Sequence, residues 1–361
     1  SGTGYIVTEG EGIAYATKVR VEPTHENKPV KSIDSLAGAR RLQSIEIPDT
    51  VDVAKGMMAG VKSSVFADCP VLEAINVYAT GDTAKTASFD GVLYVLDEES
   101  SGKTLSLVPL AKSGKIKVME GTTAIAAYAF SDIGVTEIEI PSTVTRVGAK
   151  AFENCAELEK VEFSVADESE TPAELVVEDG AFANCANLTT LKLPGRLAKG
   201  EYTQKDAAVT PYKLQINTKF NGSILEGCNK LENVEIVGKQ VNYKSIDGIV
   251  YSADGSELLY CPKGRTGKVK TDPAAKVIGN NAFNSCTELA EVEITFNIEE
   301  VGEFAFLRCY KLQNVVFGGT RDDAPLTIRK WAFAFCYKLE TLNLPENLYR
   351  VEFDIIHLSL I

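Results

Sequence analysis

The eight cysteines are the residues with the most recognisable chemistry, and seven of them occupy one position of a repeated sequence pattern. An even number of cysteines in an exported protein would suggest disulfides. However, equivalent side chains of stacked repeats run parallel and do not point at one another, which disfavours a bridge. We therefore expect buried free thiols, because cysteine packs as a small hydrophobic residue with a weak S–H donor. The repeated cysteines are Cys69, Cys155, Cys185, Cys228, Cys286, Cys309 and Cys336, whereas Cys261 stands outside the pattern.

Metal and catalytic sites are not indicated by the remaining reactive residues. The sequence has no C-x-x-C pair, and its two histidines, His25 and His357, lie at opposite ends of the chain. This spacing does not suit a thiolate zinc site or a histidine-based catalytic triad. No nucleophile elbow, Walker loop or dinucleotide-binding fingerprint is present either. The sequence therefore predicts no catalytic residues, no metal and no cofactor. A surface hydrolase would require one of the histidines to meet acidic residues in a pocket.

Carboxylates form the third group with potential chemistry. Nine short runs of the type apolar-x-apolar predict strands whose middle side chain faces outward, and five of these nine residues are glutamates. One interpretation is the solvated face of an acidic protein; the other is an acidic stripe for a cationic partner or divalent ions. No basic stripe is evident beside it. The candidate binding residues on this strand face are Glu137, Glu139, Glu162, Lys192, Glu235, Glu291 and Glu293.

Aromatic residues flank the last two repeated cysteines. Tyr310 follows Cys309, and Phe335 and Tyr337 stand on either side of Cys336. Their neighbours are expected to point inward, so these side chains should point outward. Two interpretations stay open, namely contact area for a partner and packing between loops of adjacent repeats.

The element that positions all these residues is the repeated pattern A-F-x-x-C-x-x-L-x-x-V-x-I, as in residues 282–294. Val292 and Ile294 would face inward from a short strand, and Phe283 and Cys286 would pack on the opposite wall. One such coil cannot bury its own apolar side, but a stack of coils can. The shortest spacings between equivalent phenylalanines are 22 and 23 residues. These periods lie within the roughly 20–29 residues of leucine-rich repeats.

Six stretches depart from the simple repeat. Residues 1–30 are expected to form an N-terminal cap that shields the first coil, or else a separate small module. Two inserts, near residues 88–109 and 245–262, are expected to form β-hairpins in place of a coil, and Asp254-Gly255 is a strong hairpin turn signal in the second. Polar segments 164–176 and 194–219 are expected to be loops that carry part of the binding surface. The apolar run after Leu348 suggests a C-terminal cap or the beginning of a further repeat.

Composition narrows the class of protein. With 45% hydrophobic residues the chain of 361 residues has a globular composition, and no apolar run is long enough to span a membrane as a helix. The net charge of -13 disfavours nucleic acid as a partner, because phosphates would be repelled.

Residues 181–194 and 332–345 show the complete pattern A-F-x-x-C-x-x-L-x-x-L-x-L-P, and the inserts contain D-G-V-L-Y and D-G-I-V-Y at 90–94 and 247–251. This combination resembles the BspA-like leucine-rich repeats over roughly residues 31–356, although Ala39 and Ile133 replace the cysteine in two repeats. The resemblance implies a secreted or surface-attached protein, mostly of host-associated bacteria, with adhesion or host-protein binding in some members. It implies no catalytic residues and no single shared ligand.

We therefore expect a right-handed leucine-rich-repeat solenoid with short parallel strands on one face, an N-terminal β cap (residues 1–30), a solenoid domain (residues 31–361) and two inserted hairpins. The expected function is that of a non-enzymatic secreted or cell-surface binding protein, with a host extracellular or surface protein as partner and no membrane insertion. The alternatives are a structural spacer that displays another module and a surface hydrolase.

Overall fold

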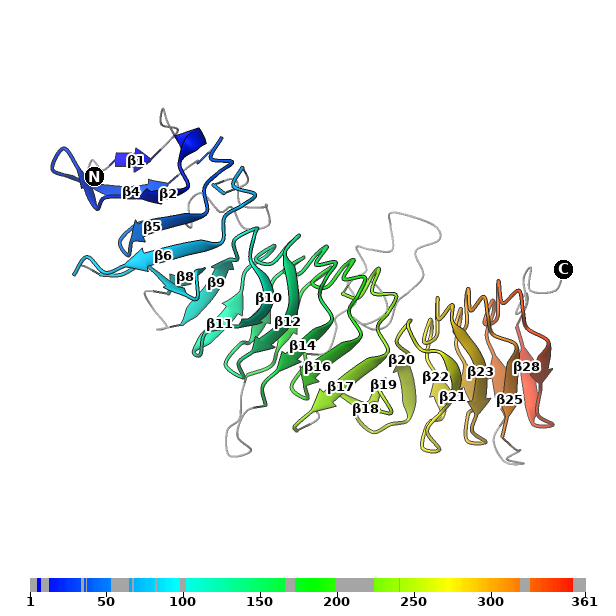
Figure 1. Cartoon of the computed structure of the whole chain (residues 1–361). Helices are drawn as coiled ribbons and strands as arrows, with labels where there is room; N and C mark the ends of the chain where they lie inside the picture. Colours follow the sequence, from blue (N-terminus) through cyan, green and yellow to red (C-terminus); the bar gives the residue numbers. More distant parts are fainter. Residues whose placement is uncertain are drawn as a thin grey trace. The chain divides into compact units, whose positions relative to one another are not determined.

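The computed structural model (Figure 1) divides the chain into two compact units, whose regular elements are almost all short strands. Unit 1 comprises residues 1–166 and 175–186, and unit 2 comprises residues 167–174 and 187–361. Among the described residues the one helical element is the 3-10 helix η1 (Ile13–Tyr15). The structure describes residues 5–7, 13–33, 36, 38–52, 65–66, 68–81, 83–97, 102–165, 173–198, 224–239, 241–318 and 325–352.

Unit 1 begins with two small sheets. The first contains β1 (Tyr5–Val7) parallel to β4 (Lys28–Ile33), with β3 (Thr24–His25) antiparallel to β4. The second is a parallel sheet of β2 (Lys18–Arg20), β5 (Ser44–Pro48) and β6 (Ala74–Tyr78). The parallel ladder of the repeats therefore already starts within residues 1–30. A capping role for these residues stays a prediction.

The rest of unit 1 has two sheets that form opposite walls of its coils. One wall is parallel throughout and contains β10 (Ser113–Lys117), β12 (Gly134–Ile140) and β14 (Lys160–Phe163). The other wall starts with antiparallel strands β7 (Thr86–Phe89), β8 (Val92–Leu96) and β9 (Lys103–Leu107). It continues with parallel strands β11 (Thr122–Ile125), β13 (Arg146–Val147) and β15 (Val176–Val177).

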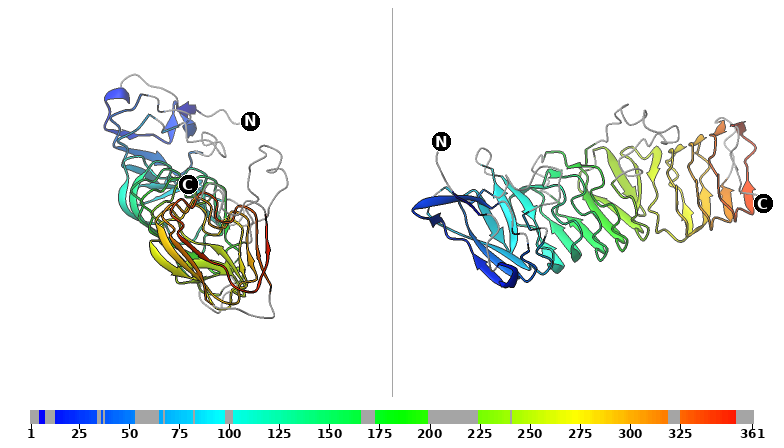
Figure 2. Two further views of the ribbon diagram at one scale, coloured as in Figure 1. Left: turned by 90° about the vertical axis from the view of Figure 1, so that its right-hand side faces the viewer. Right: turned by 90° about the horizontal axis from the view of Figure 1, so that it is seen from above.

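Unit 2 is built in the same way, and Figure 2 shows its strands stacked side by side. One wall contains the parallel pair β16 (Thr190–Pro194) and β17 (Asn233–Val237). The parallel strands β21 (Gly267–Lys270), β23 (Leu289–Ile294), β25 (Asn314–Phe317) and β27 (Thr341–Asn343) form a further sheet. The other wall contains β18 (Tyr243–Ile246), β19 (Ile249–Ser252), β20 (Glu257–Tyr260), β22 (Val277–Ile278), β24 (Glu300–Val301), β26 (Leu326–Ile328) and β28 (Leu348–Val351).

The predicted leucine-rich-repeat solenoid with two inserted hairpins is confirmed, with one addition. The prediction placed parallel strands on one face, whereas each unit carries a second parallel ladder. The second ladder is formed by the apolar residue five positions before the repeated phenylalanine, for example Val147 and Ile278. Because two-residue strands contain only one inward side chain, a period-2 pattern cannot reveal them.

The interior of each coil is filled by the repeated phenylalanine and cysteine. Phe130, Phe152 and Phe182 are fully buried, with ring centroids 4.8 and 4.9 Å apart in successive coils. In unit 2 the Phe283–Phe306 and Phe306–Phe333 centroid distances are 4.7 and 5.0 Å. These distances match the spacing of neighbouring strands, about 4.8 Å, so each ring packs on the equivalent ring of the next coil.

The prediction of buried free thiols is confirmed, because all eight cysteines are buried and free. The thiols also act as donors across coils. Cys155 Sγ lies 2.9 Å from the carbonyl oxygen of Phe130, and Cys309 Sγ lies 3.1 Å from that of Phe283. Since the acceptor belongs to the coil before, each thiol hydrogen bond joins two neighbouring coils.

In the six coils that contain Phe130, Phe152, Phe182, Phe283, Phe306 and Phe333, two residues adopt left-handed backbone conformation, one before the Ala-Phe pair and one before the cysteine position. In unit 1 the second of these positions holds Asp132, Asn154 and Asn184, with φ of 63°, 60° and 61°. Asparagine and aspartate tolerate this conformation, which costs most other side chains roughly 1–2 kcal/mol. The amides also form a ladder, because Asn184 Nδ2 donates to Asn154 Oδ1 and Asn154 Nδ2 donates to Asp132 Oδ1, each at 3.0 Å.

The two hairpin inserts are built alike. Asp90-Gly91 and Asp247-Gly248 form turns with positive φ at all four residues, as a type I′ hairpin requires. The buried Tyr94 hydroxyl accepts a hydrogen bond from the Met119 amide at 3.1 Å, and Tyr251 accepts one from Asp272 at the same distance. The two inserts are therefore alike both in the hairpin itself and in the hydrogen bond that joins it to the following coil.

Candidate binding surfaces

The strand face predicted to bind a partner begins with a lysine-rich strand in three of the sheets. These strands read K-V-R in β2, K-I-K in β10 and K-V-K in β21. Each pairs in register with a strand that carries outward glutamates. The register pairs are Arg20–Glu46, Lys115–Glu137, Lys117–Glu139, Lys268–Glu291 and Lys270–Glu293.

In unit 1 the candidate glutamates are held by lysines. Lys115 Nζ lies 2.6 Å from Glu139 and 3.6 Å from Glu137, and Lys160 Nζ lies 3.1 Å from Glu162. The hydrogen bond from Lys115 lowers the pKa of Glu139 below its ordinary value. These three carboxylates are therefore paired with lysines across or along the strands.

In unit 2 the same arrangement recurs. Lys268 Nζ lies 2.8 Å from Glu291 and 3.0 Å from Glu293, and Lys270 Nζ lies 2.6 Å from Glu293. The hydrogen bonds from Lys270 and Lys268 lower the pKa of Glu293. In the neighbouring pair of strands, Lys192 is the register partner of Glu235, and Glu235 accepts a hydrogen bond from Asn233 at 2.8 Å.

Lysines contact candidate glutamates on these strands, so the column is mixed in charge, and its role in binding stays a prediction. The lysine-rich strands carry a sequence signal of their own, the run K-[VI]-[KR], in which an inward apolar residue stands between two outward cations. The seven candidate residues do lie on the predicted strand faces, within a mixed-charge surface. No cluster of three metal-ligating side chains occurs among the described residues.

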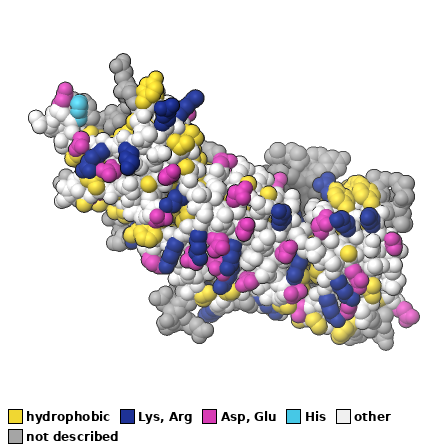
Figure 3. Space-filling model, in the orientation of Figure 1, with side chains coloured by type: hydrophobic (Ala, Val, Ile, Leu, Met, Phe, Trp, Pro, Cys, Tyr) yellow, Lys and Arg dark blue, Asp and Glu magenta, His cyan; other side chains and the backbone are white. Residues whose placement is uncertain are grey.

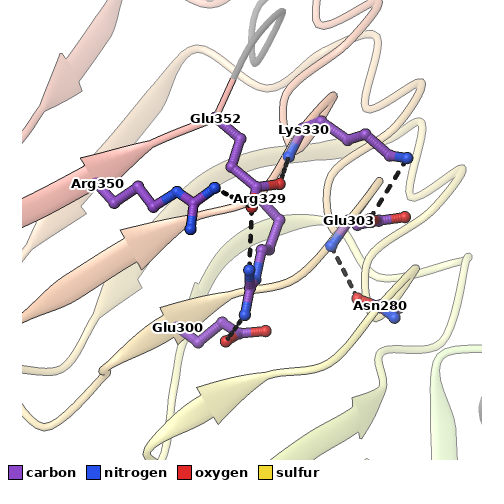
Figure 4. Close-up of polar contacts among 7 residues, drawn as sticks. All are labelled: Asn280, Glu300, Glu303, Arg329, Lys330, Arg350 and Glu352. Atoms are coloured by element: carbon purple, nitrogen blue, oxygen red, sulfur yellow. Dashed lines mark hydrogen bonds and ion pairs between the residues drawn. The ribbon is translucent and has the colours of Figure 1, made fainter.

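Behind this face, on the second ladder of unit 2, an ion-pair network joins three successive coils (Figure 4). The Arg329 guanidinium lies between Glu300 and Glu352, at 2.8 and 3.0 Å. The two carboxylates raise the pKa of Arg329, and Arg329 lowers the pKa of Glu352. Glu352 also accepts a hydrogen bond from the Lys330 amide at 3.1 Å, so the network holds the coil containing β28 to the two coils before it.

The aromatic side chains beside the last two cysteines are partly exposed, as predicted. The exposed fractions of Tyr310 and Tyr337 are 40% and 56%, and Phe335 is half-buried. The predicted loop surfaces at 164–176 and 194–219 lie largely outside the described residues, as does His357. The described histidine, His25, is exposed in β3. In the part of the chain that the structure describes, no helix is long and apolar enough to cross a membrane.

Three solved structures illustrate what the chain is similar to. The pneumococcal vaccine antigen PcpA is 20% identical, with a TM-score of 0.49, over 96% of this chain and 71% of that one. A leucine-rich repeat protein from Bacteroides ovatus is 18% identical, with a TM-score of 0.41, over 99% and 84%. A leucine rich cell surface protein from Faecalibacterium prausnitzii is 19% identical, with a TM-score of 0.33, over 77% and 87%.

The curated proteins contain no match to the sequence. The model of the BspA type leucine rich repeat region matches residues 111–232 and 263–357 in six copies, which is more than half of the chain. The matched residues include the buried phenylalanines described above and most of the repeated cysteines. The chain therefore belongs to the BspA type leucine rich repeat family.

Proposed function

We propose that this chain is a non-enzymatic binding protein, secreted or displayed at a cell surface, that recognises a host extracellular or surface protein in adhesion. The observation that carries the proposal is the row of outward side chains fixed by ion pairs on regularly spaced strands, such as Lys115–Glu139 and Lys268–Glu293. A surface that is already ordered loses little conformational entropy on binding, which favours recognition by a preformed face.

The mixed charge of the face defines the partner that would fit it. A face that mixes lysines and glutamates suits a protein surface of complementary charge, because like charges placed opposite each other are unfavourable. A nucleic acid would meet the same glutamates and a net charge of -13. The proposed contact residues on the strand face are Glu137, Glu139, Glu162, Lys192, Glu235, Glu291 and Glu293.

A structural spacer is the second candidate, and the same ion pairs favour it. Glu139 and Glu293 are satisfied within their own sheets by Lys115, Lys268 and Lys270, as expected of a surface that only needs to stay soluble and ordered. In that case the strand face has no ligand, and the chain holds another module at a distance.

The test is a binding screen of the intact chain against extracellular-matrix and serum proteins at physiological salt. A variant with E139Q, E162Q, E235Q and E293Q serves as the strand-face variant, and circular dichroism confirms that it is folded. Specific capture by the wild type that weakens at least tenfold in this variant supports recognition through the strand face. Capture of equal strength by both proteins places the contact elsewhere, and no capture by folded protein favours the spacer.

A further inference from the structure

The last two coils of unit 2 place an aromatic or arginine side chain at every left-handed position, whereas the coils from Tyr128 to Ser285 each place at least one asparagine, aspartate, glycine or serine there. Their left-handed positions hold Phe304, Arg308, Trp331 and Phe335, with φ between 56° and 60°. The equivalent positions of the last two coils of unit 1 hold Lys150, Asn154, Gly180 and Asn184. A bulky residue at positive φ is an outlier, and such strain persists where a side chain has a function. The backbone conformation favours asparagine or glycine at these positions, so it does not explain why Phe304, Arg308, Trp331 and Phe335 occupy them.

These four residues, two tyrosines and one lysine make up the surface here called the aromatic–basic corner. The Phe304 and Trp331 rings meet edge to face at 5.0 Å, and the Phe335 and Tyr337 rings meet edge to face at 6.1 Å. Tyr310 stacks on Tyr337, with centroids 5.6 Å apart and planes inclined by 8°. The corner comprises Phe304, Arg308, Tyr310, Trp331, Phe335, Tyr337 and Lys338.

Two cations of the corner differ from those of the strand face. Arg308 and Lys338 are exposed, and neither forms an ion pair with any residue that the structure describes. By contrast, Lys115, Lys268 and Lys270 each contact a glutamate. Figure 3 shows hydrophobic side chains gathered beside lysine and arginine side chains over the loops of this region. On a chain with a net charge of -13, both charged residues of this corner are cations.

We propose that the aromatic–basic corner binds an acidic segment of a partner protein, an inference that rests on the proposed binding function. Carboxylates of the segment would meet Arg308 and Lys338, and its apolar side chains would pack against Tyr310 and Tyr337. Tyrosine, tryptophan and arginine dominate the binding energy of protein interfaces, and the arginine fork matches a carboxylate. The proposed partner is a polypeptide, because its apolar side chains can pack on the tyrosine rings while its carboxylates reach Arg308 and Lys338; binding of an acidic sugar instead is an outcome of the test below.

The structure offers a variant that separates binding from folding. In R308N/F335N the two left-handed positions receive the residue found at Asn154 and Asn184, whose amides hydrogen-bond to each other at 3.0 Å. Because asparagine favours positive φ, this variant should melt at the wild-type temperature or above it. Y310S/Y337S removes the exposed rings. Y15S is the matched control, since Tyr15 is 79% exposed and lies in unit 1.

The experiment measures fluorescence anisotropy with the full chain and a labelled 12-residue peptide of aspartate, glutamate, leucine and glycine. We expect the wild type and Y15S to bind it alike, and R308N/F335N and Y310S/Y337S to bind at least about tenfold more weakly, the effect of losing one interface anchor. A peptide with asparagine and glutamine in place of the acids should bind as weakly as the variants do. Equal binding by all four proteins, or binding of heparin without binding of the acidic peptide, overturns the proposal.

A second readout distinguishes this inference from the proposed function. Any protein captured in the screen is tested against both R308N/F335N and the strand-face variant. Loss of capture in R308N/F335N supports the corner as the binding site. Capture that survives R308N/F335N but is lost in the strand-face variant overturns the corner while the proposed function stands. If the wild-type chain associates with itself and R308N/F335N does not, the corner binds a second copy of the chain. That result would overturn the proposal of an acidic partner.

Discussion

At the scale of single residues, the repeated cysteine is explained by a small interior position next to a carbonyl of the previous coil. Alanine would fill most of the volume but donate no hydrogen bond, and serine would bring a more polar hydroxyl into an apolar interior. The Cys185 and Cys336 thiols donate to the carbonyls of Phe152 and Phe306, both at 3.1 Å. The thiols are structural groups, so their reactivity should be low.

Thiol labelling tests this conclusion. Burial and the charge of Asp68 raise the pKa of Cys69 from 9.0 to about 11, so its thiolate fraction near neutral pH falls about a hundredfold. Since the folded-state pKa is the higher one, Cys69 stabilises the fold below pH 9 and this contribution is lost as the pH rises towards 11. We expect iodoacetamide to label no cysteine of the native protein rapidly and all eight in guanidinium. Rapid labelling of any cysteine in the native protein would contradict the conclusion that the thiols are buried structural groups.

At the scale of elements, the hairpin inserts are joined to the next coil by one buried hydroxyl each. Tyr94 and Tyr251 are at most 1% exposed, and each accepts a backbone hydrogen bond from a residue that follows β10 or β21, respectively. Burial raises the pKa of Tyr251 to about 12, so the hydroxyl is neutral at physiological pH. Each insert is therefore anchored on both sides and replaces a coil without opening the stack.

Removal of this hydroxyl should be costly. Y251F leaves the Asp272 amide without its acceptor, and we expect a loss of about 1–3 kcal/mol in the free energy of unfolding. Urea denaturation measures the loss, and hydrogen exchange should show faster exchange at the Asp272 amide. Y94F is the matched variant in the other insert and should behave alike. Wild-type exchange at Asp272 in Y251F would mean that the hydrogen bond does not hold the insert.

The Arg329 network makes a pH-dependent prediction. Glu352 has a folded-state pKa below the ordinary value of 4.5, so its stabilisation is present above pH 4.5 and is lost as the pH falls through the lowered pKa. E352Q should reduce stability at pH 7 by about 1 kcal/mol, a modest value because the Arg329 side chain is 34% exposed.

Thermal unfolding between pH 3 and pH 7 measures the E352Q effect, with E340Q as the control at an exposed glutamate. The wild type and E352Q should converge at low pH, and E340Q should follow the wild type throughout. A difference between wild type and E352Q that stays constant with pH would show that the ion pair is not its cause.

At the scale of the whole molecule, the interior residues repeat at fixed spacing and the surface residues do not. The sequence therefore predicts the interior better than the surface. The interior repeats phenylalanine, cysteine and leucine at fixed spacing, so the coil and the hairpin inserts follow from pattern alone. The lysine strands β10 and β21 were missed because one apolar residue between two cations gives no strand signal without its partner strand. The left-handed positions of Phe304 and Trp331 could not be predicted, since the local preference of these residues opposes that conformation.

The repeats form a regular framework, and the aromatic–basic corner on the last two coils of unit 2 is the part of it that we expect to bind a partner protein. The most direct measurement is hydroxyl-radical footprinting of the full chain, alone and in complex with a protein captured in the screen. Oxidation of Tyr310 and Tyr337 should fall strongly in the complex. Oxidation of Tyr15 and Tyr349, which are 79% and 77% exposed, should stay unchanged. Unchanged oxidation at Tyr310 and Tyr337, with protection at other residues, would contradict the account.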